Sequence, residues 1–422
     1  MREMKDSGIE WVGNIPATWK SIQIKNLFTI LSGATPTPDT DNWDGDVLWI
    51  TPADYKTKDK YVSGGKRNIS QQGFNTCSTS MIPKGSIIFS KRAPIGTVAI
   101  NTEVLCTNQG CLSCVSKADT CNDYYYYVMS VGTEHFELLG SGTTFKEISA
   151  NSFSNCKLPC PDKCEQEKIA SFLDERCSAF NCLISDIQSQ IEALEEYKRS
   201  VITEVVTKGL DPDVEMRDSG IAWVGDIPAH WITHPLYFYF GERKNKNALG
   251  LETNLLSLSY GKIIRKDINS NGGLLPESFN TYNIIEKDDI IIRPTDLQND
   301  KRSLRTGIAR EHGIITSAYI AMKAIKTVNP EYFHYLLHAY DVMKVFYNMG
   351  NGVRQGLNFS EFSRLMVFEP AIEEQNAIVS YLKEKCDEID LAIAEKKQQI
   401  ETIEEYKKSL IFEYVTGKKE VA

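Results

Sequence analysis

Two segments of the chain carry apolar side chains in a heptad pattern that is typical of coiled-coil helices. Residues 165–208 and 374–417 each place an apolar or small side chain at alternating steps of four and three residues. The first ladder has a gap at Lys198, and the second has gaps at Lys396 and Lys407. The ladder positions are Leu173, Cys177, Phe180, Ile184, Ile187, Ile191, Leu194, Val201 and Val205, followed by Leu382, Cys386, Ile389, Ile393, Ile400, Ile403, Leu410 and Tyr414. Neither segment contains proline or glycine before its last turn, so we expect two long helices.

One narrow apolar stripe on a long helix needs a partner of similar length. A helix of 44 residues is about 66 Å long, and the chain supplies one obvious partner for each segment. We therefore expect the two helices to pack on each other as an antiparallel coiled coil, with one globular domain before each helix. The alternative, in which each helix folds back onto its own domain, is disfavoured by the regularity of the ladder.

The chain also repeats itself outside the apolar ladders. The phrase "SGIEWVGNIPATW" at 7–19 returns as "SGIAWVGDIPAHW" at 219–231. Each predicted helix opens with Glu-Gln, and each carries Glu-Glu-Tyr-Lys in the same place. About 140 residues lie between phrase and helix in each half, and these two stretches barely match, except for short similarities such as "KGSIIF" against "KDDIII". The placement of the phrase predicts that it joins the start of each globular domain to the end of a neighbouring long helix.

These patterns predict an α+β protein with a pseudo-twofold internal repeat. The stretches between phrase and helix read as short strands and turn-rich loops, with one short helix each near 123–140 and 331–350. We expect two mixed α/β domains separated by the two long helices. The predicted boundaries are 1–160 for the first domain, 161–215 for the first helix, 216–370 for the second domain and 371–422 for the second helix.

The negative charge of the chain lies on the predicted helices. The formal net charge of −9 divides into 0, −7, +2 and −4 over those four segments, so the globular domains are neutral to slightly basic. No apolar run approaches the roughly 18 residues of a membrane span, and the first residues lack the apolar core of a secretory signal. We therefore expect a cytoplasmic protein, no membrane partner, and reduced thiols for the 11 cysteines.

The repeated phrase, the "GSGT" loop and the "EQ…EEYK" helices, all in alternating order, resemble the specificity subunit of type I restriction–modification systems. The resemblance covers essentially the whole chain. It implies that each variable domain is a target recognition domain for one half of a bipartite, asymmetric sequence in double-stranded DNA. It also implies that the helices set the spacing of the two half-sites, so that a change in helix length would change the spacer.

The same resemblance implies a non-catalytic chain that acts inside a larger complex. Its expected partners are two methyltransferase subunits, which dock on the conserved helices, and the restriction and translocase subunits. S-adenosylmethionine, ATP and Mg²⁺ are then expected in those partners, and no cofactor is expected in this chain.

Few residues suggest catalysis in the chain itself. There is no Pro-Pro dipeptide of an adenine methyltransferase motif, no phosphate-binding Gly-x4-Gly-Lys loop and no His-Glu-x-x-His sequence. Pro38 and Asp39, followed by Asp54 and Lys56, fit the loose spacing of a Mg²⁺-dependent nuclease. Such residues are common in turns, so a structural role is favoured.

Four cysteines in the first domain have spacings that a zinc site could use. They are Cys106, Cys111, Cys114 and Cys121. The segment around them also reads as a core strand in which small thiols replace valine or alanine, and Cys111 and Cys114 would face opposite sides of such a strand. Core packing is therefore the favoured interpretation, and no metal site is predicted.

Candidate DNA-contacting residues are basic, amide and hydroxyl side chains on loops and strand ends, because these groups contact phosphates and base edges. In the first domain they are Lys66, Arg67, Lys91, Arg92, Ser141, Thr143, Thr144 and Lys146. In the second domain they are Arg293, Lys301, Arg302, Arg305, Arg354 and Gln355. An alternative class, a coiled-coil adaptor whose domains bind proteins, is compatible with the near-neutral domains but is disfavoured by the basic segment "NDKRSLR".

Overall fold

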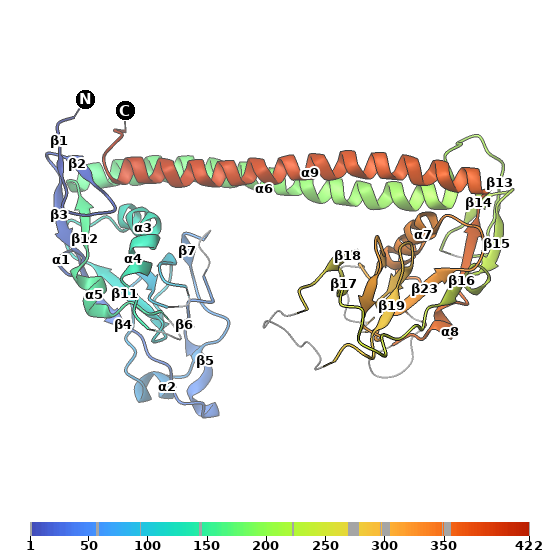
Figure 1. The fold of residues 1–422 in the computed structure, drawn as a ribbon. Helices are drawn as coiled ribbons and strands as arrows, with labels where there is room; N and C mark the ends of the chain where they lie inside the picture. Colours follow the sequence, from blue (N-terminus) through green and yellow to red (C-terminus); the bar gives the residue numbers. More distant parts are fainter. Residues whose placement is uncertain are drawn as a thin grey trace. The chain divides into compact units, whose positions relative to one another are not determined.

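A computed structural model gives the structure of the chain over most of its length. The residues described are 2–55, 59–92, 94–142, 146–221, 223–268, 278–295, 297, 304–347, 349 and 356–421. They form two compact units, of which unit 1 comprises Met1–Ile187 and Gln398–Ala422 and unit 2 comprises Gln188–Lys397. Two long helices, α6 (Lys163–Lys208) and α9 (Ile372–Val415), each contribute one part to unit 1 and the other part to unit 2 (Figure 1).

The two long helices confirm the heptad prediction, and within each unit they pack antiparallel. In unit 2, Lys198 of α6 donates to Asp390 of α9 at 2.7 Å, and Lys396 of α9 donates to Gln190 of α6 at 2.5 Å. In unit 1, Lys407 of α9 donates to Asn181 of α6 at 2.6 Å. The three gaps in the apolar ladders are therefore lysines whose stems lie along the seam while their ammonium groups reach a polar partner on the other helix.

Most ladder positions are buried between the helices. Leu173, Ile191, Leu382 and Ile389 are each 5 % exposed or less, and the remaining positions are buried or half-buried. No helix among the described residues is long and apolar enough to cross a membrane.

Unit 1 contains short strands and helices before α6. The strands are β1 (Met4–Asp6), β2 (Asn14–Pro16), β3 (Lys20–Gln23), β4 (Phe28–Ser32), β5 (Trp43–Val47), β6 (Trp49–Ile50), β7 (Tyr61–Val62), β8 (Ile87–Ser90), β9 (Val98–Asn101), β10 (Cys106–Thr107), β11 (Cys111–Ser116) and β12 (Lys157–Cys160). The helices are α1 (Ile24–Leu27), η1 (Thr40–Asn42), α2 (Gln71–Thr76), α3 (Asn122–Val131), α4 (Thr133–Leu138) and α5 (Ala150–Asn155). The single helix expected near 123–140 is thus two helices with a break at Gly132.

The core of unit 1 forms around a five-stranded sheet of order β4-β11-β8-β9-β7. Its central strand β8 is fully buried, as expected for an isoleucine-rich strand covered on both faces. Helix α3 lies against α9, because the Tyr124 hydroxyl of α3 donates to the Val415 carbonyl at 2.9 Å.

Unit 2 repeats this plan with a different sequence. Its strands are β13 (Met216–Asp218), β14 (Asp226–Pro228), β15 (Ile232–Pro235), β16 (Phe240–Glu242), β17 (Leu256–Ser259), β18 (Lys262–Arg265), β19 (Asn283–Ile285), β20 (Ile290–Ile292), β21 (Thr306–Ile308), β22 (Gly313–Ile315), β23 (Ile320–Ala324) and β24 (Met366–Glu369). Its helices before α9 are η2 (Leu236–Phe238), α7 (Pro330–Val342) and α8 (Phe359–Phe362).

The central sheet of unit 2 has the order β16-β23-β20-β21, which matches the order β4-β11-β8-β9 of unit 1. The weakly similar segments "KGSIIF" and "KDDIII" supply the corresponding strands β8 and β20. Helix α7 takes the place of α3, since its Tyr332 hydroxyl donates to the Val206 carbonyl of α6 at 3.3 Å. The predicted α+β class with an internal repeat and paired long helices is confirmed.

The last tryptophan of each repeated phrase joins the start of one long helix to the end of the other. In unit 1, the indole N–H of Trp19 donates to Glu165 in the first turn of α6 at 2.9 Å, and the ring lies beside Gly417 after α9. In unit 2, the indole N–H of Trp231 donates to Glu374 in the first turn of α9 at 3.0 Å. Both indoles are 1 % exposed, so each contributes a large buried apolar surface as well as the hydrogen bond.

The glutamine that follows each of these glutamates makes a second repeated contact. Gln166 accepts from the backbone N–H of Cys121 at 2.9 Å, and Gln375 accepts from the backbone N–H of Asn329 at 2.8 Å. These two donors lie immediately before α3 and α7, so the glutamines fix the start of each domain helix. We call the tryptophan, glutamate and glutamine contacts together the fastening of each unit. It bears out the prediction that the phrase joins domain to helix.

The residue after α9, Gly417, must be a glycine for two reasons: its backbone conformation and its close contact with the repeated phrase. Gly417 has φ of +71°, and a Cβ there would lie 2.4 Å from Pro16 Cδ. Gly13 in the same phrase has φ of +68°, but a Cβ there would meet no atom within 4 Å. A comparison of the two glycines therefore distinguishes the cost of a left-handed backbone from the cost of steric overlap.

We expect Gly417→Ala to lower the free energy of unfolding more than Gly13→Ala. Both changes place a side chain in the left-handed region, which costs about 1–2 kcal/mol. Gly417→Ala adds overlap with Pro16, which costs roughly another 1–3 kcal/mol. Denaturant unfolding of the two variants and the parent chain measures the difference. Equal losses of unfolding free energy in both variants would show that overlap with Pro16 does not restrict position 417.

Candidate functional site

Four predicted residues of the first domain gather around Glu147. The Lys91 ammonium lies 2.7 Å from the Glu147 carboxylate, and an Arg92 guanidinium nitrogen lies 3.5 Å from it. Backbone hydrogen bonds at 3.0 Å join Ser141 to Glu147, and Lys146 is exposed next to it in the sequence. The hydrogen bond from Lys91 holds the pKa of the Glu147 carboxyl below its usual range. One carboxylate is thus shared by the two cations and offsets half of their charge.

The other described pair in unit 1 lies on a separate loop. Arg67 forms an ion pair with Asp44 at 3.1 Å and lies over the ring of Trp43 at 4.2 Å from its centroid. Lys66 is exposed, and its backbone N–H donates to Asp54 at 3.0 Å. Because Arg67 stacks on an indole, its guanidinium is held in one orientation on the surface.

In unit 2, the structure places two predicted residues together and changes the role of one. Arg293 is exposed at the end of β20. Arg305 is 1 % exposed, and its guanidinium donates to the Tyr347 hydroxyl at 3.2 Å and to the carbonyls of Arg293 and Thr295. The expectation that Arg305 contacts DNA is therefore corrected. Arg305 lies inside the domain, where its guanidinium donates to the carbonyls of residues that follow β20.

The remaining predicted contact residues lie outside the described residues. They are Thr143, Thr144, Lys301, Arg302, Arg354 and Gln355. Their roles stay predictions.

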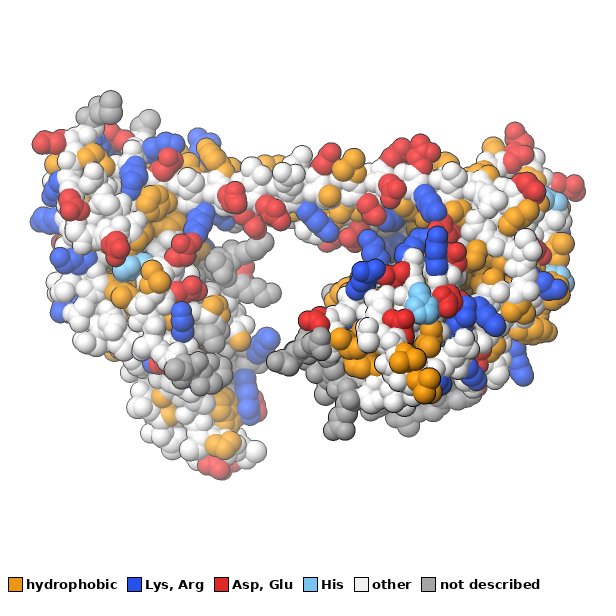
Figure 2. Space-filling view, in the orientation of Figure 1, with side chains coloured by type: hydrophobic (Ala, Val, Ile, Leu, Met, Phe, Trp, Pro, Cys, Tyr) orange, Lys and Arg blue, Asp and Glu red, His pale blue; other side chains and the backbone are white. Residues whose placement is uncertain are grey.

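A basic segment of unit 2 was missed by counting charge over whole domains. Residues 243–266 contain six Lys or Arg and one Asp or Glu. They run from the end of β16 through β17 and β18, and Lys262 and Lys266 are exposed. Figure 2 shows Lys and Arg side chains gathered on the globular part of unit 2. A local charge count over a window of this length is the signal that would have found the segment.

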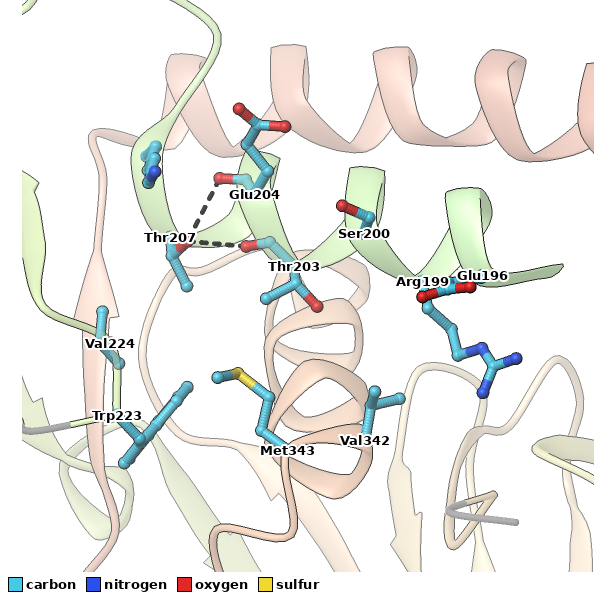
Figure 3. Close-up of a pocket in the computed structure, with 11 residues that line it drawn as sticks. Glu196, Arg199, Ser200, Thr203, Glu204, Thr207, Trp223, Val224, Val342 and Met343 are labelled. Atoms are coloured by element: carbon cyan, nitrogen blue, oxygen red, sulfur yellow. Dashed lines mark hydrogen bonds between the residues drawn. The ribbon is translucent and has the colours of Figure 1, made fainter. Parts of the chain in front are cut away.

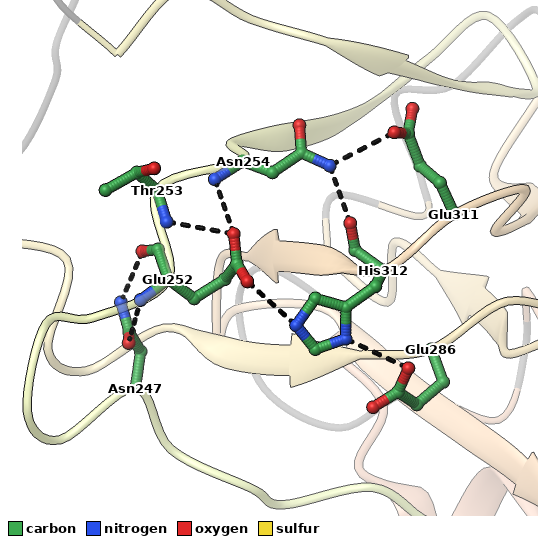
Figure 4. A network of polar contacts seen from close by, with 7 residues as sticks. All are labelled: Asn247, Glu252, Thr253, Asn254, Glu286, Glu311 and His312. Carbon is green, nitrogen blue, oxygen red and sulfur yellow. Dashed lines mark hydrogen bonds and ion pairs between the residues drawn. The ribbon is translucent and has the colours of Figure 1, made fainter.

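A histidine between two carboxylates ties this basic segment to the rest of unit 2. The His312 ring lies 2.8 Å from Glu252 and 2.9 Å from Glu286, one carboxylate at each ring nitrogen (Figure 4). Next to it, Asn254 donates to the His312 carbonyl at 2.6 Å and to Glu311 at 3.2 Å. The hydrogen bond with Glu286, together with the charge of Glu252, raises the pKa of His312.

The residues that could have formed a nuclease site have structural partners. Asp54 accepts hydrogen bonds from the Thr51 backbone N–H and hydroxyl, both at 2.8 Å, as well as from Lys66. Asp39 accepts from Thr37 at 3.0 Å. Lys56 lies outside the described residues. Asp54 therefore closes a turn, which is the structural role that the sequence favoured.

The cysteines of the first domain pack into separate apolar clusters. Cys106, Cys111 and Cys114 are all fully buried, and each belongs to a different cluster. Burial raises the pKa of Cys106 to about 11 and that of Cys111 to about 12, which keeps both thiols protonated. Among the described residues no group of three His, Cys, Asp or Glu side chains could hold a metal ion. The core interpretation accounts for these thiols.

The first tryptophan of each phrase lines a surface groove beside a long helix. In unit 2, Trp223 packs edge-on against Tyr340 at 4.3 Å between centroids, and the groove lies between it and α6 (Figure 3). The groove residues are Glu196, Arg199, Ser200, Thr203, Glu204, Thr207, Lys208, Trp223, Val224, Val342 and Met343. We call it the Trp223 groove.

Unit 1 has a groove made from the corresponding positions. The Trp11 groove is lined by Trp11, Val131, Gly132, Glu134, His135, Glu405, Lys408, Ser409 and Phe412. Each groove thus takes one tryptophan from the phrase, a valine at the end of α3 or α7, and a Glu, a basic residue and a Ser from the "EEYK" part of a long helix. The Trp11 groove is the smaller, about 390 against 810 Å³, and Phe412 occupies the position of Thr203.

The fold and the site together define a chain with two different globular domains, each joined by the same fastening to a pair of shared helices. Residues 16–193 match a family model described as the type I restriction modification DNA specificity domain. The type I restriction enzyme MjaIX specificity subunit of Methanocaldococcus jannaschii is 36 % identical over 189 residues. These cover 44 % of this chain and 43 % of that protein, so the chain spans less than half the length of this relative.

One further relative and one solved structure match nearly the whole chain. The putative type I restriction enzyme MjaX specificity subunit of the same organism is 24 % identical over 96 % of this chain and 95 % of its own length. A solved structure, titled as the basis of complex assembly and conformational transition of the type I R-M system, shares the fold with a TM-score of 0.69. It covers 96 % of this chain and 99 % of its own at 12 % identity. These comparisons show that the chain is similar to type I restriction–modification specificity subunits.

The His312 contacts predict a pH dependence for the stability of unit 2. The folded pKa of His312 lies above its ordinary value of 6.5, so its stabilisation is complete below pH 6.5 and is lost as the pH rises through the raised value. Hydrogen bonds from the backbone N–H of Asn254 lower the pKa of Glu252 below 4.5, so its contribution is lost only in more acidic solution. We expect the unfolding temperature of unit 2 to fall between mildly acidic and mildly basic pH.

His312→Gln should remove this slope while keeping a hydrogen-bonding side chain. Arg265→Gln is the matched control, because it breaks the adjacent ion pair with Glu311 and leaves His312 between its carboxylates. Thermal unfolding at a series of pH values makes the measurement. A slope that is the same in the parent and in His312→Gln would refute the assignment.

Proposed function

We propose that this chain is the sequence-specific DNA-binding subunit of a type I restriction–modification complex. Each globular domain reads one half of a bipartite, asymmetric target in double-stranded DNA. The paired helices set the distance between the half-sites and carry the docking positions for two methyltransferase subunits. Restriction and translocase subunits complete the assembly.

The observation that carries this proposal is that the two units share the fastening contacts but differ in the sequences of their globular domains. The contacts of Trp19 and Trp231, and of Gln166 and Gln375, are the same in both units. The segments between them share little sequence, and their surfaces carry different side chains. A protein that holds two different surfaces by identical supports is suited to recognising two different short sequences at once.

Phosphate contacts are supplied by basic side chains that are exposed in both units. Arg67 lies on an aromatic ring in unit 1, and Arg293, Lys262 and Lys266 are exposed in unit 2. These groups supply the electrostatic part of DNA binding, while neighbouring loop side chains read base edges. The acidic long helices would be repelled by phosphates, so contacts with DNA fall to the domains.

Catalysis belongs to the partners in this proposal. Methyl transfer from S-adenosylmethionine and ATP- and Mg²⁺-dependent cleavage take place in the other subunits, and this chain supplies the position on DNA. The Trp11 and Trp223 grooves support two equivalent docking positions, because they repeat a Glu, a basic residue and a Ser around a tryptophan.

Sequencing of adenine methylation in cells that carry this chain with its methyltransferase partner tests the proposal. We expect methylated sites to share two short blocks separated by a fixed number of unspecified base pairs. Arg67→Ala should weaken binding about equally at all sites and leave both blocks unchanged, because its proposed contact is with a phosphate, whereas exposed Glu103→Ala should leave both the binding and the blocks unchanged. Absence of site-specific methylation, or one continuous motif, would count against a two-domain reader.

The grooves predict how many methyltransferase subunits bind. We expect Arg199→Glu to remove one docking position and Lys408→Glu to remove the other, so that each single variant binds one methyltransferase subunit and the double variant binds none. Lys397→Glu, on an exposed position of α9, is the control for charge reversal alone. Mass measurement of the purified complexes gives the stoichiometry. Two subunits bound to the double variant would exclude the grooves as the docking positions.

A further inference from the structure

Two leucines stand in solvent on one short loop of unit 2. Leu249 is 82 % exposed and Leu251 is 80 % exposed, and they flank Gly250, which has φ of +66°. The loop lies between β16 and β17. An isolated exposed leucine is ordinary, but two on one turn leave an apolar point that water does not favour. We call Asn247–Asn254 the leucine tip.

The leucine tip is held rigidly from within. Asn247 is 3 % exposed, and its side chain donates to the Glu252 carbonyl at 2.9 Å and accepts from the Glu252 N–H at 3.1 Å. The Gly250 N–H donates to the Asn247 carbonyl at 2.8 Å, which closes the turn. The Glu252 carboxylate accepts from the backbone N–H groups of Thr253 and Asn254 at 2.9 and 2.7 Å, and it pairs with His312 (Figure 4).

A rigid exposed apolar turn is suited to insertion into a partner. Ordering the loop on binding costs little conformational entropy, because the loop is already ordered by these hydrogen bonds. In unit 1, the stretch directly after β4, the counterpart of β16, reads "GATPTPDTDN" and contains no leucine. The tip is therefore not part of the repeated scaffold, which indicates a role in what unit 2 alone recognises.

The charge around the tip indicates what that partner is. The tip lies inside the segment 243–266, in which six basic residues accompany one acidic residue. Arg243, Lys244 and Arg265 are paired with carboxylates outside the segment, whereas Lys262 and Lys266 are exposed. Lys266 is close to the base of the tip, because its backbone N–H donates to the Leu255 carbonyl at 2.8 Å. An apolar groove on a protein would accept the leucines but would not require the exposed lysines. Double-stranded DNA accounts for both, since phosphates attract the lysines and the space between base pairs accepts an apolar wedge.

We propose that the leucine tip inserts between adjacent base pairs and unstacks one step in the half-site bound by unit 2. This proposal rests on the proposed DNA-reading function and adds indirect readout to it, because the cost of unstacking depends on the step. Pyrimidine–purine steps, which unstack most easily, are the expected sites. The hydrogen bonds of Asn247 and Glu252 keep the two leucines in place during insertion.

The test uses the complex of this chain with its methyltransferase partner and DNA containing the target found by methylation sequencing. 2-Aminopurine is placed at successive positions of the half-site bound by unit 2. We expect the parent complex to raise the fluorescence at one or two adjacent positions. Leu249→Ser with Leu251→Ser should abolish this rise and weaken specific binding by about tenfold, because both side chains are exposed and their loss leaves the fold intact.

Leu138→Ser is the matched control, since Leu138 is 81 % exposed at the end of α4 in unit 1. It should leave fluorescence and affinity unchanged. Retention of the fluorescence rise and of the affinity in the double variant would overturn the proposal. Loss of the methyltransferase subunits from the double variant, with DNA fluorescence unchanged, would also overturn it and assign the tip to protein docking. Absence of specific DNA binding by the parent complex would instead reject the DNA-reading function itself.

Discussion

The hydrogen bond from each buried indole to the first turn of a long helix is the contact on which the rest of the structure depends. Trp19 and Trp231 each lie where one helix begins and the other ends. A large apolar ring at such a junction is stable only if its N–H has a partner, and Glu165 and Glu374 supply that partner. Their position in the first turn is also favourable, because a carboxylate there faces the positive end of the helix dipole.

This arrangement explains how the globular domains can differ while their supports do not. The tyrosine hydroxyls of α3 and α7 donate to backbone carbonyls of the opposite long helix, at Val415 and Val206. Gln166 and Gln375 accept from backbone N–H groups before the domain helices and donate to the carbonyls of Pro161 and Pro370. Contacts made to the backbone place few demands on the side chains of the domain, so its outer loops can change without loss of the fastening.

The sequence predicted the parts of this fold that depend on periodicity and missed those that depend on long-range pairing. The heptad ladders predicted α6 and α9, because an apolar seam of that length has few other solutions. In the sequence, the ladders are interrupted at Lys198, Lys396 and Lys407. The structure shows that each lysine has a polar partner on the opposite helix, 192 to 226 residues away. From the sequence, Arg305 was predicted to lie on the surface because its neighbours are basic. Its burial depends on the strands and the helix that surround it in the fold, which the local sequence does not reveal. Charge counted over whole domains concealed the basic segment 243–266.

The ion pairs of the basic residues have a consequence for affinity. Lys91 and Arg92 face Glu147, Arg67 faces Asp44, and Arg265 faces Glu311. If the chain binds DNA as proposed, a phosphate that binds these cations must take the place of a carboxylate, so each contact would contribute less than an unpaired lysine would. Each domain alone would then bind DNA weakly. Strong binding would require both domains to engage the same DNA, since the second domain, tethered by the shared helices, would bind at a high effective concentration once the first is in place. Weak binding by each domain would thus favour the complete bipartite site over either half.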